Sequence, residues 1–229
     1  KEVNVDKDII KITNDKLHLK DPRKCVKKEK TNLMFKNHEN LKFIESTESN
    51  YSIYDTYFKP GILNLLDNKG NNILLFSYGQ TGSGKTYTII GTKSENGILH
   101  NIFETILSKK SIVVFNCLEI YNESIYNLLE NKNKIKSWKS ILELSKNTKI
   151  TNMKELQKVL LKIRDQRIIG KSKLNCNSNR AHTIYKLSIE GKTIVLVDLA
   201  GTERSSTTLA SNPEQYRELG NINLSLFSL

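Results

Sequence analysis

The fold expected for this chain is decided by residues 79–86, Gly79-Gln80-Thr81-Gly82-Ser83-Gly84-Lys85-Thr86. They fit the pattern G-x-x-x-x-G-K-[ST] in full, and they follow the short apolar run Ile73–Tyr78, which predicts a strand. The glycines let consecutive backbone N–H groups point at phosphate oxygens, and the helix that starts there adds the positive end of its dipole. Lys85 supplies a mobile charge for the β and γ phosphates, and the Thr86 hydroxyl can ligate magnesium. The stretch therefore predicts a P-loop that binds ATP and Mg²⁺.

A second apolar run, Val195–Leu199, contains the carboxylate of Asp198 and is followed by Gly201. In P-loop NTPases an aspartate at this kind of strand end holds magnesium, usually through water, and the glycine N–H meets the γ-phosphate. An aspartate at a strand end is often only a cap. Because a P-loop precedes this one, Asp198 is the second predicted magnesium ligand beside Thr86.

The composition is that of a soluble globular protein, with 38% hydrophobic and 26% charged residues, and 229 residues are enough for one domain. No apolar run approaches the roughly 20 residues of a membrane helix, so membrane insertion is not expected. The N-terminal residues lack the apolar core of a signal peptide. Three widely separated cysteines form no CxxC pair, which favours a reducing compartment and disfavours a zinc site.

The net charge of +12 has two interpretations. It can mark an acidic partner, or it can reflect a residue bias, since lysines are spread along the chain and asparagine is abundant. The charge is therefore consistent with an acidic filament without identifying one. No RNA-recognition, zinc-finger or helix-turn-helix pattern is visible, so no nucleic acid is expected as a partner.

Strands and helices are predicted to alternate along the chain. The predicted strands are Ile10–Ile12, Leu17–Leu19, Ser52–Phe58 (with a turn), Ile73–Tyr78, Ile112–Tyr121, Thr183–Ile189 and Thr193–Leu199. Helices are predicted at Pro60–Leu66, at Ile98–Leu107 and from Asn152 onward, where Glu155 completes a helix-start signal. This alternation indicates the α/β class, with a central mostly parallel or mixed sheet flanked by helices on both faces.

Five motifs then make the chain resemble the kinesin motor domain. Residues 79–88 have the P-loop wording GQTGSGKTYT, and 118–123 with 128–129 are similar to the strand-and-helix signature EIYNE…DLL. Residues 175–182 resemble switch I (N-x-x-S-S-R-S-H), 198–204 resemble switch II (DLAGSER), and 221–226 resemble NINKSL. The motifs occur in the order of the family. The resemblance covers about residues 41–229, so the prediction is a single, incomplete motor domain over 1–229 whose residues 1–40 match poorly.

The resemblance implies a role for each matching residue. The phosphates and adenine would be bound by Gly79, Gln80, Thr81, Gly82, Ser83, Gly84, Lys85, Thr86 and Tyr87, with Tyr87 near the adenine. Magnesium would be held by Thr86 and Asp198. The catalytic set would be Ser178, Asn179, Arg180, Gly201 and Glu203. In that set Ser178 and Asn179 close switch I, Gly201 senses the γ-phosphate, and Arg180 with Glu203 forms the ion pair that links the two switches. His182 is expected to pack or hydrogen-bond structurally.

Two departures from the family bear on the reaction. Asn179 stands where the family has a second serine beside magnesium, and Ala181 lacks the next hydroxyl. Both put the rate of hydrolysis in question but leave nucleotide binding intact. The resemblance thus leaves two functions open: a microtubule-based motor ATPase, or a kinesin-like microtubule-binding protein with weak or no turnover. In either case it implies tubulin as partner, the cytoplasm and cytoskeleton as location, and oligomerisation set by segments outside this chain.

Overall fold

The computed structural model describes residues 10–13, 16–19, 36–38, 48–135, 148–169 and 180–202. The chain divides into two compact units, Lys1–Glu48 and Ser49–Leu229. In the first unit, the strands β1 (Ile10–Thr13), β2 (Lys16–Leu19) and β3 (Lys36–His38) form an antiparallel sheet in that order. The two strands predicted near the N-terminus are therefore confirmed. None of the described helices is both long and apolar enough to cross a membrane.

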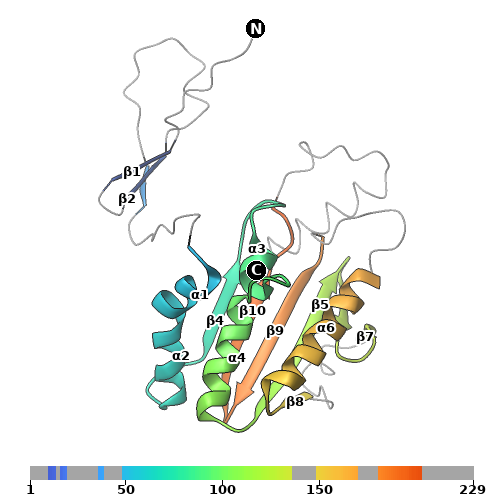
Figure 1. Ribbon diagram of the computed structural model, residues 1–229. Coiled ribbons are helices and arrows are strands. Elements are labelled where there is room, and N and C mark those ends of the chain that lie inside the picture. Colours follow the sequence, from blue (N-terminus) through green and yellow to red (C-terminus); the bar gives the residue numbers. More distant parts are fainter. Residues whose placement is uncertain are drawn as a thin grey trace, which may run out of the picture. The chain divides into compact units, whose positions relative to one another are not determined.

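The second unit is built on a seven-stranded sheet (Figure 1). Its strands are β4 (Ile73–Ser77), β5 (Val113–Tyr121), β6 (Ser124–Asn127), β7 (Asn133–Ile135), β8 (Thr148–Ile150), β9 (His182–Ile189) and β10 (Lys192–Asp198). Their spatial order is β4-β10-β9-β5-β6-β7, with β8 paired to β5. The β4–β10 pair is parallel and the other described pairs are antiparallel, so the sheet is mixed.

The parallel pairing of β4 with β10 positions the site. In this register Ile194 lies opposite Ile73, and Asp198 lies opposite Ser77. Parallel strands end at the same edge of a sheet, so the P-loop that follows β4 emerges beside the carboxylate that ends β10. Two sequence motifs far apart in the chain thereby become neighbours.

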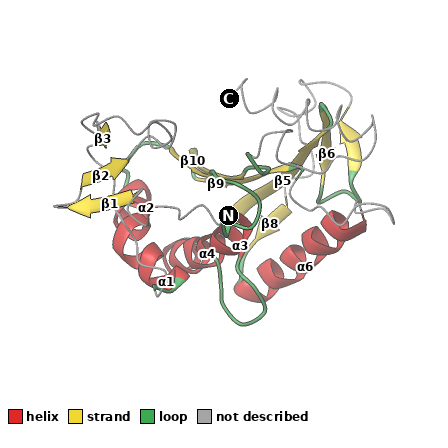
Figure 2. Ribbon diagram, turned by 90° about the horizontal axis from the view of Figure 1, so that it is seen from above, coloured by secondary structure: helices red, strands yellow, loops and turns green. Residues whose placement is uncertain are grey.

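The described helices of this unit cover one face of the sheet (Figure 2). They are α1 (Asn50–Ile53), a π-helical segment (Tyr54–Phe58), α2 (Lys59–Leu66), α3 (Lys85–Ile90), α4 (Ile98–Lys109) and α6 (Met153–Ile169). On edge strand β4 the alternate side chains Leu74, Phe76 and Tyr78, the last just past its end, are 63–70% exposed. The described residues place no helix on the second face of the sheet, where the sequence analysis also expected helices.

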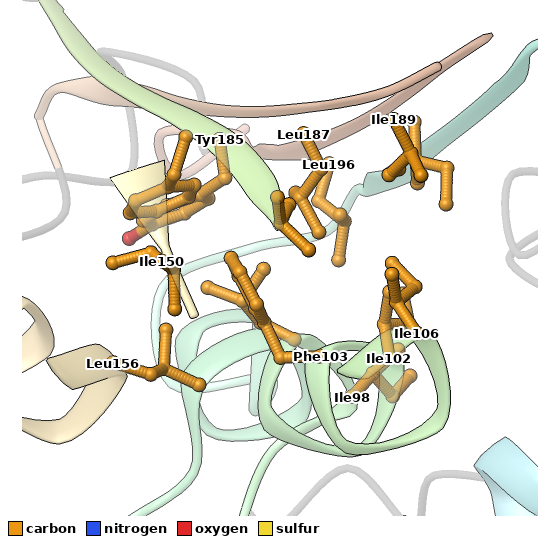
Figure 3. Packing of buried hydrophobic residues seen from close by; sticks show 14 of the residues in the cluster. Ile98, Ile102, Phe103, Ile106, Ile150, Leu156, Tyr185, Leu187, Ile189 and Leu196 are labelled. Carbon is orange, nitrogen blue, oxygen red and sulfur yellow. The ribbon is translucent and has the colours of Figure 1, made fainter. Parts of the chain in front are cut away.

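The core lies between these helices and the sheet (Figure 3). Ile98, Ile102 and Ile106 recur at helical spacing on α4, and together with Phe103 they are buried against the strands. The Phe103 ring meets Phe115 of β5 edge to face, with ring centroids 5.2 Å apart. Leu156 brings α6 into the same cluster. One continuous core therefore fixes both α4 and α6 on the sheet that carries the site.

Two local predictions are wrong. Residues 52–58, predicted as a strand and turn from their aromatic content, are helical, because tertiary packing outweighs β-propensity. Tyr54 is buried, and its hydroxyl donates to Thr105 of α4 at 2.6 Å. Residues 118–127 of the strand-and-helix signature instead belong to the hairpin β5–β6, and residues 128–129 form a turn in which Leu128 N donates back to Cys117 O at 3.0 Å. A β-ladder thus uses the backbone groups that a helix would need.

Candidate functional site

The P-loop joins the end of β4 to the start of α3. Gly82 and Gly84 have φ angles of 82° and 88°, a region that side chains with a Cβ rarely adopt, and Gly84 is the residue from which α3 begins. Lys85 Nζ donates to the carbonyl oxygens of Gly79 and Gln80, both at 2.8 Å. The ammonium group therefore lies over the loop that is predicted to hold phosphates.

The two motifs meet in a hydrogen bond from Thr86 Oγ1 to Asp198 Oδ2, which is 2.7 Å long. These residues are 112 positions apart in the chain, and the β4–β10 register brings them together. A hydroxyl and a carboxylate oxygen side by side are the hard ligands that Mg²⁺ prefers. The donor set thus fits a magnesium ion that takes its remaining ligands from phosphate and water.

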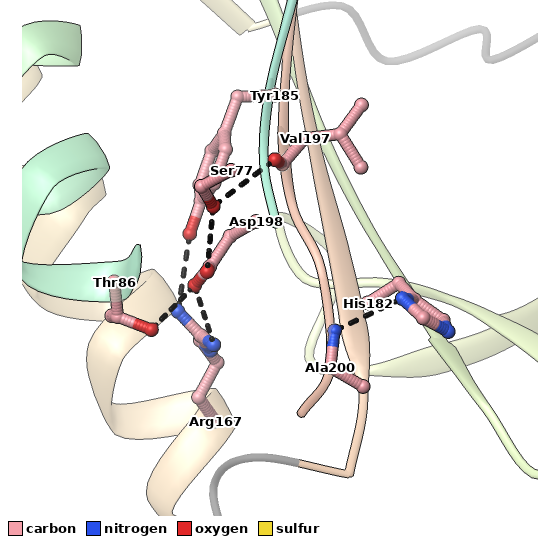
Figure 4. A network of polar contacts seen from close by, with 8 residues as sticks. All are labelled: Ser77, Thr86, Arg167, His182, Tyr185, Val197, Asp198 and Ala200. Carbon is pink, nitrogen blue, oxygen red and sulfur yellow. Dashed lines mark hydrogen bonds and ion pairs between the residues drawn. The ribbon is translucent and has the colours of Figure 1, made fainter. Parts of the chain in front are cut away.

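Asp198 is held by more than the threonine (Figure 4). Its side chain is 2% exposed, and Arg167 Nη2, from the last turn of α6, lies 3.3 Å from Oδ2. Ser77 Oγ donates to Oδ1 at 3.4 Å, and Arg167 Nη1 donates to the Tyr185 hydroxyl at 3.2 Å. Burial raises the pKa of Tyr185 well above its usual range, so the phenol stays neutral and accepts this bond. The network fixes the orientation of the carboxylate.

The chain after Asp198 is tied to both sides of the site. The Ala200 amide donates to His182 Nδ1 at 3.0 Å, so this nitrogen is an acceptor and the structural hydrogen bond predicted for His182 is present (Figure 4). Burial lowers the pKa of His182, an effect that Asp198 partly offsets. The Thr202 amide donates to Gly79 O at 3.2 Å. Gly201, predicted to sense the γ-phosphate, is therefore held between the sheet and the P-loop.

A cleft of about 250 Å³ opens over these groups. Its lining is Gly82, Gly84, Lys85, Thr86, Tyr87, Arg167, Ala181, Asp198 and Leu199. Tyr87 is 41% exposed, and Ala181 places the end of the predicted switch I at the cleft, without a hydroxyl. Cation, hydroxyl and carboxylate thus converge on one opening, as a Mg²⁺-bound polyphosphate requires.

The structure brings some of the predicted site residues together and leaves others outside its described ranges. Gly82, Gly84, Lys85, Thr86 and Tyr87 line the cleft together with Asp198, whereas Gly79, Gln80, Thr81, Ser83 and Gly201 are not part of its lining. Ser178, Asn179 and Glu203 lie outside the described residues, so the predicted ion pair between Arg180 and Glu203 stays a prediction. Arg180 itself directly precedes Ala181 of the cleft wall.

Arg167 was missed by the sequence analysis, although a signal was present. It falls four residues after buried Ile163, on the face of α6 that otherwise carries apolar side chains. A charge that continues an apolar stripe predicts a buried partner of opposite sign. Sequence alone could not name Asp198 as that partner.

The family model for the kinesin motor domain matches residues 2–229. This range includes residues 2–40, in which none of the quoted motifs occurs. The kinesin heavy chain of Botryotinia fuckeliana is 32% identical, with 77% of this chain and 23% of the relative covered. Human KIF13B is 31% identical over 81% of this chain and 12% of that protein. Kinesin-related protein 4 of Dictyostelium discoideum is 35% identical over 70% of this chain and 10% of that protein. The chain thus spans at most about a quarter of these curated relatives.

Solved kinesin structures have the same fold. A fast kinesin superposes with a TM-score of 0.68 at 23% identity, over 94% of this chain and 65% of the other. A KIF14 dimer with AMP-PNP, in complex with a microtubule, superposes with a TM-score of 0.69 at 24% identity, over 96% of this chain and 69% of the other. At this level of identity the likeness establishes the fold. The architecture is thus that of a P-loop NTPase of the kinesin motor type.

Replacing Arg167 with Ala is expected to lower the free energy of unfolding by about 3–5 kcal/mol, because it leaves the buried Asp198 carboxylate without its cation. Urea unfolding followed by circular dichroism measures the change. Arg164→Ala on the exposed side of the same helix is the matched control and is expected to cost less than about 0.5 kcal/mol. Equal effects of the two substitutions would contradict the assigned pairing.

Mild acid is expected to destabilise the fold through His182. Because burial lowers its pKa in the folded state, the unfolded chain takes up the proton first, and stability falls as the pH drops below about 6.5. His182→Asn keeps an acceptor for Ala200 N but cannot titrate there, so the slope of stability against pH should become shallower. Burial also lowers the pKa of His100, so His100 continues to contribute to the pH dependence of stability in the His182→Asn variant. Unfolding midpoints between pH 5 and 8 measure this, and an unchanged slope would contradict it.

Proposed function

The chain belongs to the kinesin motor domain family, and on that premise we propose that it binds and hydrolyses Mg²⁺-ATP as part of a microtubule-based motor ATPase. The proposed setting is the microtubule cytoskeleton of the cytoplasm. Among its relatives, KIF14 has been solved on microtubules with AMP-PNP and with ADP. The net charge of +12 suits an acidic filament.

The observation that carries the proposal is the 2.7 Å hydrogen bond between Thr86 and Asp198, at a cleft that Lys85 also lines. A structural serine or threonine could cap α3 without any carboxylate from β10, and a glycine-rich turn needs no lysine folded over it. Their convergence on one cleft is what Mg²⁺-triphosphate binding requires.

The proposed reaction is in-line attack by water on the γ-phosphoryl group. Lys85 would leave the Gly79 and Gln80 carbonyls to contact the β and γ phosphates, and the loop N–H groups would bind the remaining phosphate oxygens. Bound Mg²⁺ supplies positive charge for the transferring phosphoryl group. Thr86 would hold it directly and Asp198 through water, while Arg167 keeps the Asp198 carboxylate in place.

The switch residues would complete the site. Ser178 and Asn179 would close over the γ-phosphate and the attacking water, and the Gly201 amide would meet the γ-phosphate. Arg180 and Glu203 would link the two switches and orient the water. Catalysis then depends mainly on positioning and on charge stabilisation.

A second candidate function is a kinesin-like microtubule-binding protein with weak or no turnover. Ala181 supports it, because this residue lines the cleft and offers no hydroxyl to water or phosphate. Asn179 supports it from the sequence, since an amide stands where the family has a hydroxyl. ATP turnover of the full-length protein with and without microtubules separates the two candidates: the motor ATPase is stimulated by microtubules, and the static binder is not.

Lys85→Ala is expected to weaken ATP binding about 100-fold, because removing one partner of a charge-assisted contact costs about 2–5 kcal/mol. Titration with a fluorescent ATP analogue measures the affinity. Lys154→Ala, which removes an equal charge from an exposed position of α6, should leave the affinity unchanged. An unchanged affinity of Lys85→Ala would refute the P-loop assignment.

Asn179→Ser is expected to speed single-turnover hydrolysis about tenfold, equivalent to about 1.4 kcal/mol of barrier. The longer amide has to displace a water or shift the loop, and a misplacement of about 1 Å can cost about 100-fold in rate. Quenched-flow measurement on the full-length protein gives the rate, and ATP affinity serves as the internal control because it should not change. If the serine variant is no faster, Asn179 is not a catalytic handicap.

A further inference from the structure

We propose that Glu95 is a positioning residue that fixes the ring of Tyr87 as the face against which the adenine base lies. This inference rests on the proposed function, because it assumes that the cleft binds ATP with its base near Tyr87. It adds a residue from the turn between α3 and α4, which none of the sequence motifs includes.

Both carboxylate oxygens of Glu95 are engaged. Asn50 N, in the first turn of α1, donates to Oε1 at 2.6 Å. The Tyr87 hydroxyl donates to Oε2 in a short hydrogen bond. Asn50 closes the ring of contacts, since its buried side-chain amide donates to Tyr87 O at 3.1 Å. Glu95 is thus clamped between a helix start and the phenol.

The turn that carries Glu95 has little freedom to move. Thr92 N donates to Glu95 O at 2.8 Å, and Thr92 Oγ1 accepts from the Glu95 amide at 3.2 Å. Gly91, at a φ of 85°, lies so close to the turn that an added Cβ would be 2.2 Å from Glu95 O. Gly97 N donates to Ile90 O at 3.2 Å and leads directly into buried Ile98 of α4. The turn therefore holds the Glu95 backbone in a fixed position.

Holding the hydroxyl restricts the ring. Tyr87 is one of the residues that line the cleft and is 41% exposed, so packing alone does not select one orientation of its ring. The bond to Glu95 anchors the far end of the ring, and the helix backbone anchors the near end. The same bond lowers the pKa of Glu95, as does the Asn50 amide, and it raises the pKa of Tyr87, so the pair keeps its donor and acceptor at neutral pH. A preoriented aromatic face costs less entropy when a base stacks on it.

A purely structural explanation is that Glu95 only staples the turn to α1. The two explanations differ in what they predict for ligands. If the role is only structural, loss of the Glu95 contacts changes the affinity for every ligand of the site or for none. If Tyr87 supports adenine, the loss changes the affinity only for ligands that carry a base. Tripolyphosphate has the phosphates of ATP without the base or the ribose, so Mg²⁺-ATP and Mg²⁺-tripolyphosphate separate the two.

The experiment compares the affinities of the full-length protein for these two probes by calorimetry. Glu95→Ala and Tyr87→Phe are each expected to weaken ATP binding about fivefold, a part of the roughly 5- to 150-fold that base–aromatic stacking can contribute, and to leave tripolyphosphate binding unchanged. The double variant should be no worse than either single one, because both remove the same bond. Glu95→Gln should restore ATP affinity, since its amide can accept from Asn50 N and donate to the Tyr87 oxygen. Glu104→Ala on the exposed side of α4 is the charge-matched control.

Each other outcome overturns the inference. If Glu95→Ala weakens the binding of ATP and tripolyphosphate equally, Glu95 has only a structural role. If ATP affinity is unchanged in Glu95→Ala or Tyr87→Phe, the Tyr87 ring is not a contact surface for adenine. If the unsubstituted protein binds tripolyphosphate but not ATP, the adenine assignment fails while the P-loop stands. If it binds neither, the proposed function fails and the inference with it.

Discussion

The hydrogen bond between the Thr86 hydroxyl and the Asp198 carboxylate is the contact on which the rest of the site depends. It exists because β4 and β10 are adjacent and parallel, with Asp198 opposite Ser77. An antiparallel pairing would place the P-loop and the carboxylate at opposite edges of the sheet. The site is therefore a consequence of topology as much as of its motifs, and the core under α4 maintains that topology.

Burying the Asp198 carboxylate would be costly without charged and polar partners. Arg167, Ser77 and Thr86 supply them from α6, β4 and α3, three elements that are otherwise tied to one another through the hydrophobic core. Such an arrangement couples the carboxylate to the position of α6.

The structural features that could be predicted from sequence are those that a run of consecutive residues specifies. The P-loop needs eight successive residues, and the strands on either side of Glu190–Gly191 are rich in apolar and β-branched residues, so both follow from local chemistry. The helical state of residues 52–58 does not, because it depends on Tyr54 reaching Thr105 on another helix. The role of Arg167 likewise depends on Asp198, which is 31 residues away, and that of Glu95 depends on Tyr87, which is 8 residues away. No local sequence pattern can select such partners. The order of the strands also depends on pairings between distant segments, which explains why the sequence left the sheet as mostly parallel or mixed.

The central claim is that Thr86 and Asp198 together form the magnesium end of a nucleotide site. Pulsed electron paramagnetic resonance with Mn²⁺ in place of Mg²⁺ tests it most directly, because it counts metal bound in the presence and absence of ADP and detects ³¹P coupling from the phosphates. We expect one Mn²⁺ site that appears only with ADP, and a loss of that site in both Thr86→Ala and Asp198→Asn. Retention of the ³¹P-coupled Mn²⁺ signal, with unchanged affinity in both variants, would contradict the account.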